Sequence, residues 1–283
     1  MSDTAFENGT WRSADGLTLH YRDHPGRDDR PPILCLPGLT RNARDFEPVA
    51  DAFGGEWRVI AAEFRGRGDS AYAKDPDTYR PATYVEDVLA LLDHLGVVKV
   101  VALGTSLGGI VTMLLALKHK ARLVGAVLND IGPDVEDAGL ERIRGYVGHG
   151  RSYPTWMHAA RSLKDGNADV YPDFEMADWL RFAKRLCVVG SGGRISYDYD
   201  MKIAEPFLEE PVDMWPLFSA LDGIPVLALR GELSDILWEE TLEKMQREMP
   251  DMAAVTVPGV GHPPTLEEPA AQAAIAQLLG RIA

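Results

Sequence analysis

Residues 99–117 read KVVALGTSLGGIVTMLLAL, and this stretch decides the fold. Its first part, 100–103, is a short valine-rich apolar run, which is typical of a strand buried on both faces. After the sharp turn 104–108 (GTSLG), the apolar run is too long for a second strand and predicts a helix. A strand, a G-x-S-x-G turn and a helix in this order predict a nucleophile elbow that exposes the hydroxyl of Ser106.

The glycines of this turn have a steric reason. Gly104 and Gly108 stand two positions before and after Ser106, where larger side chains would collide across the bend. The N–H of Leu107 is unpaired at the start of the expected helix, so it can donate to an anion that forms beside the serine hydroxyl. Because about one chain in ten of this size carries G-x-S-x-G by chance, the prediction depends on the flanking strand and helix.

The composition fits a globular protein with an ample core. The chain has 283 residues, of which 46% are hydrophobic and 25% charged, enough for one large or two small domains. A net charge of −14, spread along the chain, disfavours nucleic acid and anionic membranes as partners. The segment MSDTAFENGT is polar, and no apolar run approaches the about 18 to 20 residues that cross a bilayer. We therefore expect a cytoplasmic protein with a small-molecule substrate, in which Cys35 and Cys187 are reduced thiols.

Strand-like and helix-like patterns alternate along most of the chain. Segments 10–13 and 17–22 flank Asp15-Gly16 and predict an antiparallel pair. Further strands are expected at 33–36, 57–62, 100–103, 123–128, 225–230 and 253–257. With helices between them, these segments predict an α/β fold with a mainly parallel, eight-stranded sheet flanked by helices.

Residues 133–216 break this alternation. Large aromatic side chains gather there without regular spacing, which indicates a mostly helical insertion. The sequence therefore predicts one core made of residues 1–132 and 217–283, interrupted by the insertion.

A serine becomes nucleophilic only when a base removes its proton, and the base needs a carboxylate to orient it. His262 occupies a glycine- and proline-rich loop just beyond the last expected strand, where catalytic groups of open α/β sheets gather. Asp235 follows an expected strand and gives the chain order Ser106, Asp235, His262, which is typical of the nucleophile elbow. Asp130, directly after another strand, and Glu232, in the same loop as Asp235, are the alternatives. We favour Asp235 over Asp130.

These motifs together resemble the α/β-hydrolase fold superfamily, in particular its serine esterases with a helical lid, over nearly the full chain. The segment 104–109 (GTSLGG) is similar to the family's elbow, 261–262 (GH) to its histidine loop, and 63–70 (EFRGRGDS) to a frequent D-x-R-G-x-G-x-S loop. The resemblance implies a second oxyanion donor, the N–H of Leu39, beside that of Leu107. It also implies that residues 133–216 form a helical cap over the site.

Two positions depart from the family pattern. Many relatives carry His-Gly where this chain has Pro37-Gly38. Proline lacks an N–H, but the implied donor is Leu39, so the oxyanion hole survives with altered loop support. The aspartate that opens the arginine–glycine loop is Glu63 here, and we interpret that loop as structural, with Arg65 tying neighbouring turns together.

The sequence thus predicts a serine hydrolase that cleaves a carboxylic ester of a small to medium, partly apolar substrate through an acyl-enzyme. Trp156, Trp179 and Trp215 are the candidate substrate contacts from the insertion. We expect no cofactor and no metal. The segment 186–193 (LCVVGSGG) imitates a dinucleotide loop, but its pattern fails at Ile195, and H-E-x-x-H, paired C-x-x-C and Walker motifs are missing from the sequence.

Other reactions on the same scaffold remain open. They are carbon–carbon bond hydrolysis of a diketone, lactone or amide opening, and acyl transfer. A non-catalytic ligand receptor is an alternative from another class of protein. Ser106 argues against the family's dehalogenases and epoxide hydrolases, which use aspartate at the elbow.

Overall fold

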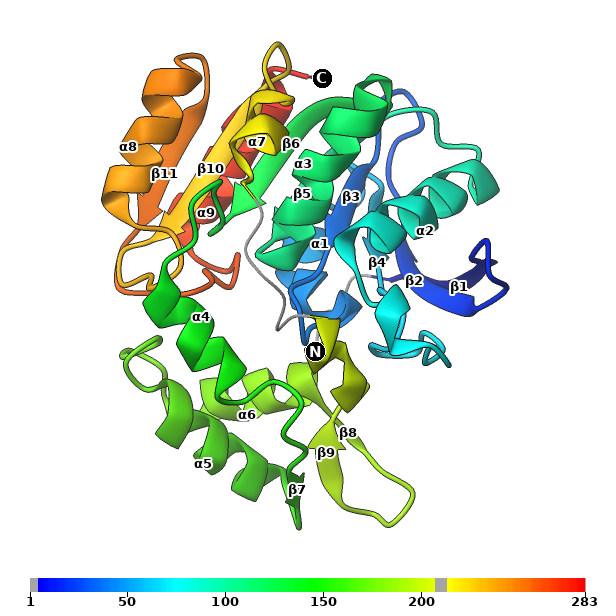
Figure 1. Ribbon diagram of the computed structural model, residues 1–283, viewed down its shortest axis with the longest axis vertical. Coiled ribbons are helices and arrows are strands. Elements are labelled where there is room, and N and C mark those ends of the chain that lie inside the picture. The colour runs from blue at the N-terminus through cyan, green and yellow to red at the C-terminus, as the bar shows by residue number, and fades with distance from the viewer. Residues whose placement is uncertain (1–4, 207–212, 283) are drawn as a thin grey trace.

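A central sheet organises the computed structural model, which describes residues 5–206 and 213–282. Its strand order is β1-β2-β4-β3-β5-β6-β10-β11, so the predicted eight-stranded sheet is confirmed (Figure 1). The strands are β1 (Glu7–Arg12), β2 (Thr18–His24), β3 (Ile33–Leu36), β4 (Val59–Ala62), β5 (Val100–Thr105), β6 (Leu123–Asn129), β10 (Val226–Gly231) and β11 (Ala253–Val257).

The sheet is mainly parallel. Only β2 runs antiparallel, to both β1 and β4, and the remaining neighbours in the sheet are parallel. Every residue of β3, β4 and β5 is buried, which explains why these strands are continuous apolar runs rather than alternating ones. The turn between β1 and β2 contains Gly16 with a φ of +84°, a conformation that glycine adopts without strain.

Helices cover both faces of the sheet (Figure 1). Successive side chains of β3 enter two separate hydrophobic clusters, with Leu34 in one and Cys35 in the other. Residues of α2, α3 and α8 belong to the first cluster, and residues of α1 and α9 to the second. The bounds are α1 (Glu47–Phe53), α2 (Pro81–His94), α3 (Leu107–His119), α8 (Glu239–Glu248) and α9 (Pro269–Gly280). Cys35 and Cys187 are both buried and free.

A separate lobe follows the carboxyl end of β6 (Figure 1). We call its described part, residues 133–206, the insertion. It contains three α-helices, in line with the expected mostly helical insertion, but also a small three-stranded sheet of order β7-β9-β8 that was not expected. These strands have two or three residues each, too few to show a periodicity. The elements are α4 (Asp137–Arg144), β7 (Ser152–Tyr153), α5 (Trp156–Asn167), α6 (Met176–Leu186), β8 (Cys187–Val189) and β9 (Ile195–Tyr197). The short α7 (Trp215–Ser219) lies instead beside α3 on the core (Figure 1).

The arginine–glycine loop joins the insertion to the core. Gly68 N–H donates to the carbonyl of Asp198, and Asp200 N–H donates to that of Gly66. Arg65 in the same loop is buried and donates to Asp15, in the turn between β1 and β2, and to Asp87 of α2. It therefore ties its loop to a neighbouring turn, as predicted, and also to a helix. In 5–206 and 213–282, no helix is both long enough and apolar enough to span a membrane.

Candidate active site

Ser106 occupies the strained turn between β5 and α3. Its φ of 52° and ψ of −115° lie in a region that non-glycine residues rarely adopt. A Cβ added to Gly104 would lie 2.3 Å from the carbonyl oxygen of Gly108, and one added to Gly108 would lie 2.0 Å from that of Leu36. Neither position has room for a side chain, as predicted from the spacing of the two glycines around Ser106.

His262 connects Ser106 to a buried carboxylate. Its Nε2 lies 3.0 Å from the hydroxyl of Ser106, and its Nδ1 lies 2.7 Å from Oδ2 of Asp130. His262 comes from the loop that follows β11, and Asp130 follows β6 directly. With Nδ1 facing a carboxylate, the proton of a neutral imidazole belongs on Nδ1, and Nε2 is left to accept the serine proton.

The surroundings of Asp130 fix its orientation. Its side chain is fully buried, and its backbone adopts a φ of 57° that turns the chain sharply at the end of β6. The N–H of Gly231 donates to Oδ1 at 2.7 Å, and the hydroxyl of Ser234 donates to Oδ2 at 2.6 Å. Both donors come from the end of β10 or the turn after it, so the neighbouring strand holds the carboxylate toward His262.

The prediction that Asp235 orients His262 is wrong, because Asp130 is the carboxylate that bonds the imidazole. Asp235 accepts hydrogen bonds from Nε and Nη2 of Arg142 in α4, at 2.5 and 2.8 Å. Burial alone would raise the pKa of the Asp235 carboxyl, but the hydrogen bonds and charge of Arg142 outweigh it and hold the pKa below its usual range. The turn after β10 brings Ser234 to Asp130, while the next residue points to the insertion.

Glu232, the third carboxylate that we considered, serves the backbone. Its Oε2 accepts from the N–H of Gly259 at 2.8 Å and so braces the loop that carries His262. The sequence carried one signal for Asp130, which directly follows a buried strand, but Asp235 also follows a strand, a few residues further on, so this signal did not decide between them.

A cavity of about 190 Å³ lies at Ser106 and His262. Core and insertion both contribute residues to its wall. Its other lining residues are Gly38, Leu39, Thr40, Arg41, Thr105, Arg142, Ile143, Tyr146, His149, Arg151, Ser162, Leu163, Gly166, Asn167, Tyr171, Phe182, Leu186, Tyr197, Tyr199 and Pro263.

The three tryptophans predicted to contact substrate do not line this cavity. Trp179 is 1% exposed and packs edge-on against Tyr171 and Phe182, inside the insertion. Trp156 is a half-buried residue of α5 that packs on the same hydrophobic cluster. Trp215 donates to Asp134 and carries Lys244 of α8 over its ring. The tyrosines and leucines of the insertion that line the cavity are Tyr146, Leu163, Tyr171, Leu186, Tyr197 and Tyr199.

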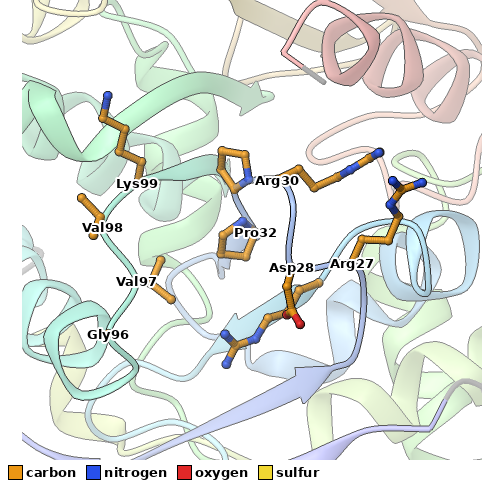
Figure 2. A pocket seen from close by; sticks show the side chains of 10 residues that line it. Arg27, Asp28, Arg30, Pro32, Gly96, Val97, Val98 and Lys99 are labelled. Atoms are coloured by element: carbon orange, nitrogen blue, oxygen red, sulfur yellow. The ribbon is translucent and has the colours of Figure 1, made fainter.

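A larger cavity, of about 320 Å³, lies at the opposite end of the sheet (Figure 2). Pro32 and Lys99, which directly precede β3 and β5, belong to its wall. Its arginines are paired, Arg27 and Arg30 with Asp29 and Arg58 with Asp23. Its described lining residues include no nucleophile with an adjacent base, so its volume alone does not make it a catalytic site.

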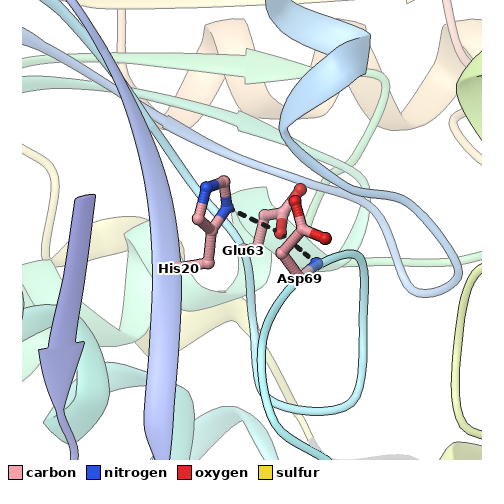
Figure 3. Close-up of side chains that lie close together, drawn as sticks. All are labelled: His20, Glu63 and Asp69. Carbon is pink, nitrogen blue, oxygen red and sulfur yellow. Dashed lines mark hydrogen bonds and ion pairs between the residues drawn. The ribbon is translucent and has the colours of Figure 1, made fainter. Parts of the chain in front are cut away.

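His20, Glu63 and Asp69 lie close enough together to suggest a metal site (Figure 3). The carboxylate of Glu63 is already used, because it accepts from Asp69 N–H at 2.7 Å and Ala43 N–H at 3.2 Å and bonds His20 Nδ1 at 2.9 Å. Nε2 of His20 lies 2.9 Å from Oδ1 of Asn8. These contacts make the cluster a support for the arginine–glycine loop.

The comparisons with known proteins agree with this geometry. Residues 33–275 match the model of the alpha/beta hydrolase family. The chain belongs to this family. It is 35% identical over 255 residues to a 3-hydroxybutyrate-oligomer hydrolase of Cupriavidus necator, covering 86% of each chain. It is 27% identical to a 2-(acetamidomethylene)succinate hydrolase of Mesorhizobium japonicum, covering 87% of this chain and 85% of the relative.

A solved structure resembles the whole chain. The crystal structure of an alpha/beta hydrolase from Novosphingobium aromaticivorans has 58% sequence identity and a TM-score of 0.94, with 98% of this chain and 99% of that chain covered. The relatives with a named activity are hydrolases, which places this alpha/beta hydrolase among proteins that cleave bonds in small molecules.

Proposed function

We propose that the protein is a serine hydrolase that cleaves a carboxylic ester of a small to medium, partly apolar substrate through an acyl-enzyme. The observation that carries this proposal is the hydrogen-bonded series Ser106, His262, Asp130 at the cavity, with distances of 3.0 and 2.7 Å. Ser106 attacks the acyl carbon while Nε2 of His262 takes its proton and returns it to the leaving alcohol. Asp130 holds the imidazole and stabilises its positive charge, and water then releases the acid.

The N–H groups of Leu39 and Leu107 hold the oxyanion in this mechanism. Leu107 is the first residue of α3, so its N–H is free of the helical ladder. The loop that carries Leu39 runs beside the nucleophile, since a Cβ on Gly38 would lie 3.8 Å from that of Ser106. Nε of the buried Arg67 donates to the Leu39 carbonyl at 2.9 Å and holds this loop in place. In comparable sites, one such donor contributes about 3 to 4 kcal/mol to transition-state stabilisation.

The insertion is the cap of this site in our proposal, and residues 1–132 and 217–283 are the core. Tyr146, Leu163 and Tyr197 support this division, because they come from the insertion and line the same cavity as Ser106. They supply apolar contact and exclude water from the acyl-enzyme. A volume of about 190 Å³ favours a short acyl group.

Ester chemistry is favoured by the relative from Cupriavidus necator. Its name gives an oligomer of 3-hydroxybutyrate as the substrate, and the units of a hydroxy-acid oligomer are joined by ester bonds. That relative matches most of this chain, which supports the same bond type here.

The first test is covalent labelling with a fluorophosphonate probe, which reacts with an activated serine. We expect labelling of the native protein, none in Ser106→Ala, and full labelling in Ser162→Ala. Ser162 is the matched control because it lines the same cavity but bonds Tyr153 instead of a histidine. A native protein that stays unlabelled, or a Ser106→Ala variant that is labelled, would contradict the proposal.

A substrate panel then decides the bond type. Short-chain alkyl esters, a lactone, an amide and a vinylogous diketone are compared at equal concentration. We expect ester turnover to exceed the others at least about tenfold, a difference of about 1.4 kcal/mol in activation free energy. Faster cleavage of the diketone or the amide would assign the site to one of the alternative reactions.

A further inference from the structure

The charge of the cavity wall is opposite to that of the chain. The protein has 43 acidic and 29 basic residues, yet the described residues of the wall include Arg41, Arg142 and Arg151 and no aspartate or glutamate. A concave site lined by charges of one sign concentrates ligands of the opposite sign. The wall is therefore suited to an anionic ligand.

Two of the arginines are held rigidly at the wall. Nε and Nη2 of Arg142 donate to Asp235, and the same two groups of Arg41 donate to Asp45. Both arginines line the cavity, whereas neither aspartate does. Nη1 makes no hydrogen bond to a described residue in either arginine and remains available as a donor. Arginine donors that are fixed in this way bind carboxylates with little loss of side-chain freedom.

Arg41 and Arg142 line the same cavity as Ser106 and His262. Both arginines also interact electrostatically with Tyr146 and Tyr171, two further residues of its wall. Asp235, the partner of Arg142, in turn interacts electrostatically with His262. Arg142 and His262 therefore share both a cavity wall and an electrostatic neighbour.

Arg151 adds a charge that is not compensated within the described chain. It follows α4, lines the cavity, and forms no ion pair with a residue in 5–206 or 213–282. Its side chain is exposed, so a substitution here removes a charge without opening the core.

We propose that the cavity binds substrates that carry a free carboxylate within a few bonds of the scissile carbonyl, and that Arg41, Arg142 and Arg151 recognise this carboxylate. The inference rests on the proposed ester hydrolysis only for the identity of the reacting group. It assigns the anionic, short-chain half-esters as the substrate class.

A structural role for Arg142 predicts a different result. Its ion pair with Asp235 joins the insertion to the core, and loss of this pair alone would weaken binding of charged and neutral ligands alike. The informative quantity is therefore the ratio of affinities for two ligands that differ only in charge.

The test measures binding to Ser106→Ala, which prevents turnover and makes the result independent of the catalytic proposal. Monomethyl succinate is compared with methyl succinamate, which has a neutral amide in place of the carboxylate, by isothermal titration calorimetry. We expect the carboxylate to bind about 10- to 100-fold more tightly, the range that charge-assisted hydrogen bonds give. Equal affinities would overturn the proposal.

Variants in the same Ser106→Ala background locate the site. Arg151→Gln and Arg142→Gln should each reduce the affinity ratio at least about threefold, because each removes a cation from the wall. Arg144→Gln is the matched control, since Arg144 lies on the same helix but pairs with Glu141 outside the cavity wall. A ratio that all three variants leave unchanged would show that the arginines do not bind the carboxylate. Failure of the native protein to hydrolyse either ester would contradict the proposed function and leave the binding result standing.

Discussion

The elbow and the insertion meet at one cavity, but their sequences specify their parts of it in different ways. At the elbow, a backbone that bends within a few residues places Ser106 and leaves a local pattern of glycines. In the insertion, side chains such as Tyr146 and Leu163 reach the cavity only through the packing of several short elements. The position of the serine therefore depends on local backbone geometry, whereas the positions of the cavity residues from the insertion depend on tertiary structure.

The largest expected effect is a loss of protein stability when the packing inside the insertion is disrupted. Trp179→Ala removes a side chain that is 1% exposed, and the cavity it leaves should cost about 3 to 5 kcal/mol in the free energy of unfolding. Urea denaturation measures this loss, with the half-buried Trp156→Ala as a milder control. A changed preference among acyl-chain lengths with unaltered stability would show instead that Trp179 forms the substrate wall.

A substitution at the elbow should instead lower the catalytic activity. A Cβ at Gly104 would lie 2.3 Å from a backbone oxygen, so Gly104→Ala must shift α3 or Ser106. We expect kcat/KM for a short ester to fall at least about 100-fold, because small misplacement of a reacting group is costly. Gly280→Ala, with nothing within 4 Å of its added Cβ, is the control for a glycine substitution. Native activity in Gly104→Ala would refute the steric account of the elbow.

A substitution in the part of the cavity wall that the insertion supplies should change the preference among acyl-chain lengths. Leu163→Ala shortens a buried wall residue and makes room for a longer acyl chain. The kcat/KM for a hexanoate ester, divided by that for a butyrate ester, should rise about tenfold. One or two methylene groups in an apolar pocket contribute an effect of this size. Leu242→Ala, a buried residue of α8 that does not line the cavity, controls for lost stability. An unchanged ratio in Leu163→Ala would remove this residue from the wall.

The smallest effect concerns the contact between the insertion and the core at the turn after β10. The pKa of Asp235 is lowered in the folded protein, so its pair with Arg142 contributes stability above the unfolded pKa of about 3.8 and loses it as the pH falls through the folded value. Asp235→Asn should therefore cost less than about 1 kcal/mol at pH 7, and this cost should be smaller at pH 2. Denaturation at both pH values measures the difference. An equal cost at both would show that the pair does not act through charge.

The sequence allowed the sheet, the elbow and the position of His262 to be predicted, because each depends on a short pattern of apolar residues and glycines. It did not separate Asp130 from Asp235. Both follow strands, and only the fold shows that the turn after β10 offers Ser234 to Asp130 while Asp235 pairs with Arg142. The prediction that the tryptophans contact substrate was wrong, because large aromatic residues in an insertion can pack in its hydrophobic core as well as line a cavity. The wall arginines carried no sequence signal, since their role depends on which face of the fold they reach.

The central claim is that Asp130 completes the catalytic series with Ser106 and His262. Kinetics of a short-chain ester with Asp130→Asn and Asp235→Asn test it most directly. We expect kcat to fall about 10⁴-fold in Asp130→Asn, as when the orienting carboxylate of other serine hydrolases is lost, and less than about tenfold in Asp235→Asn. A larger loss in Asp235→Asn than in Asp130→Asn would contradict the account.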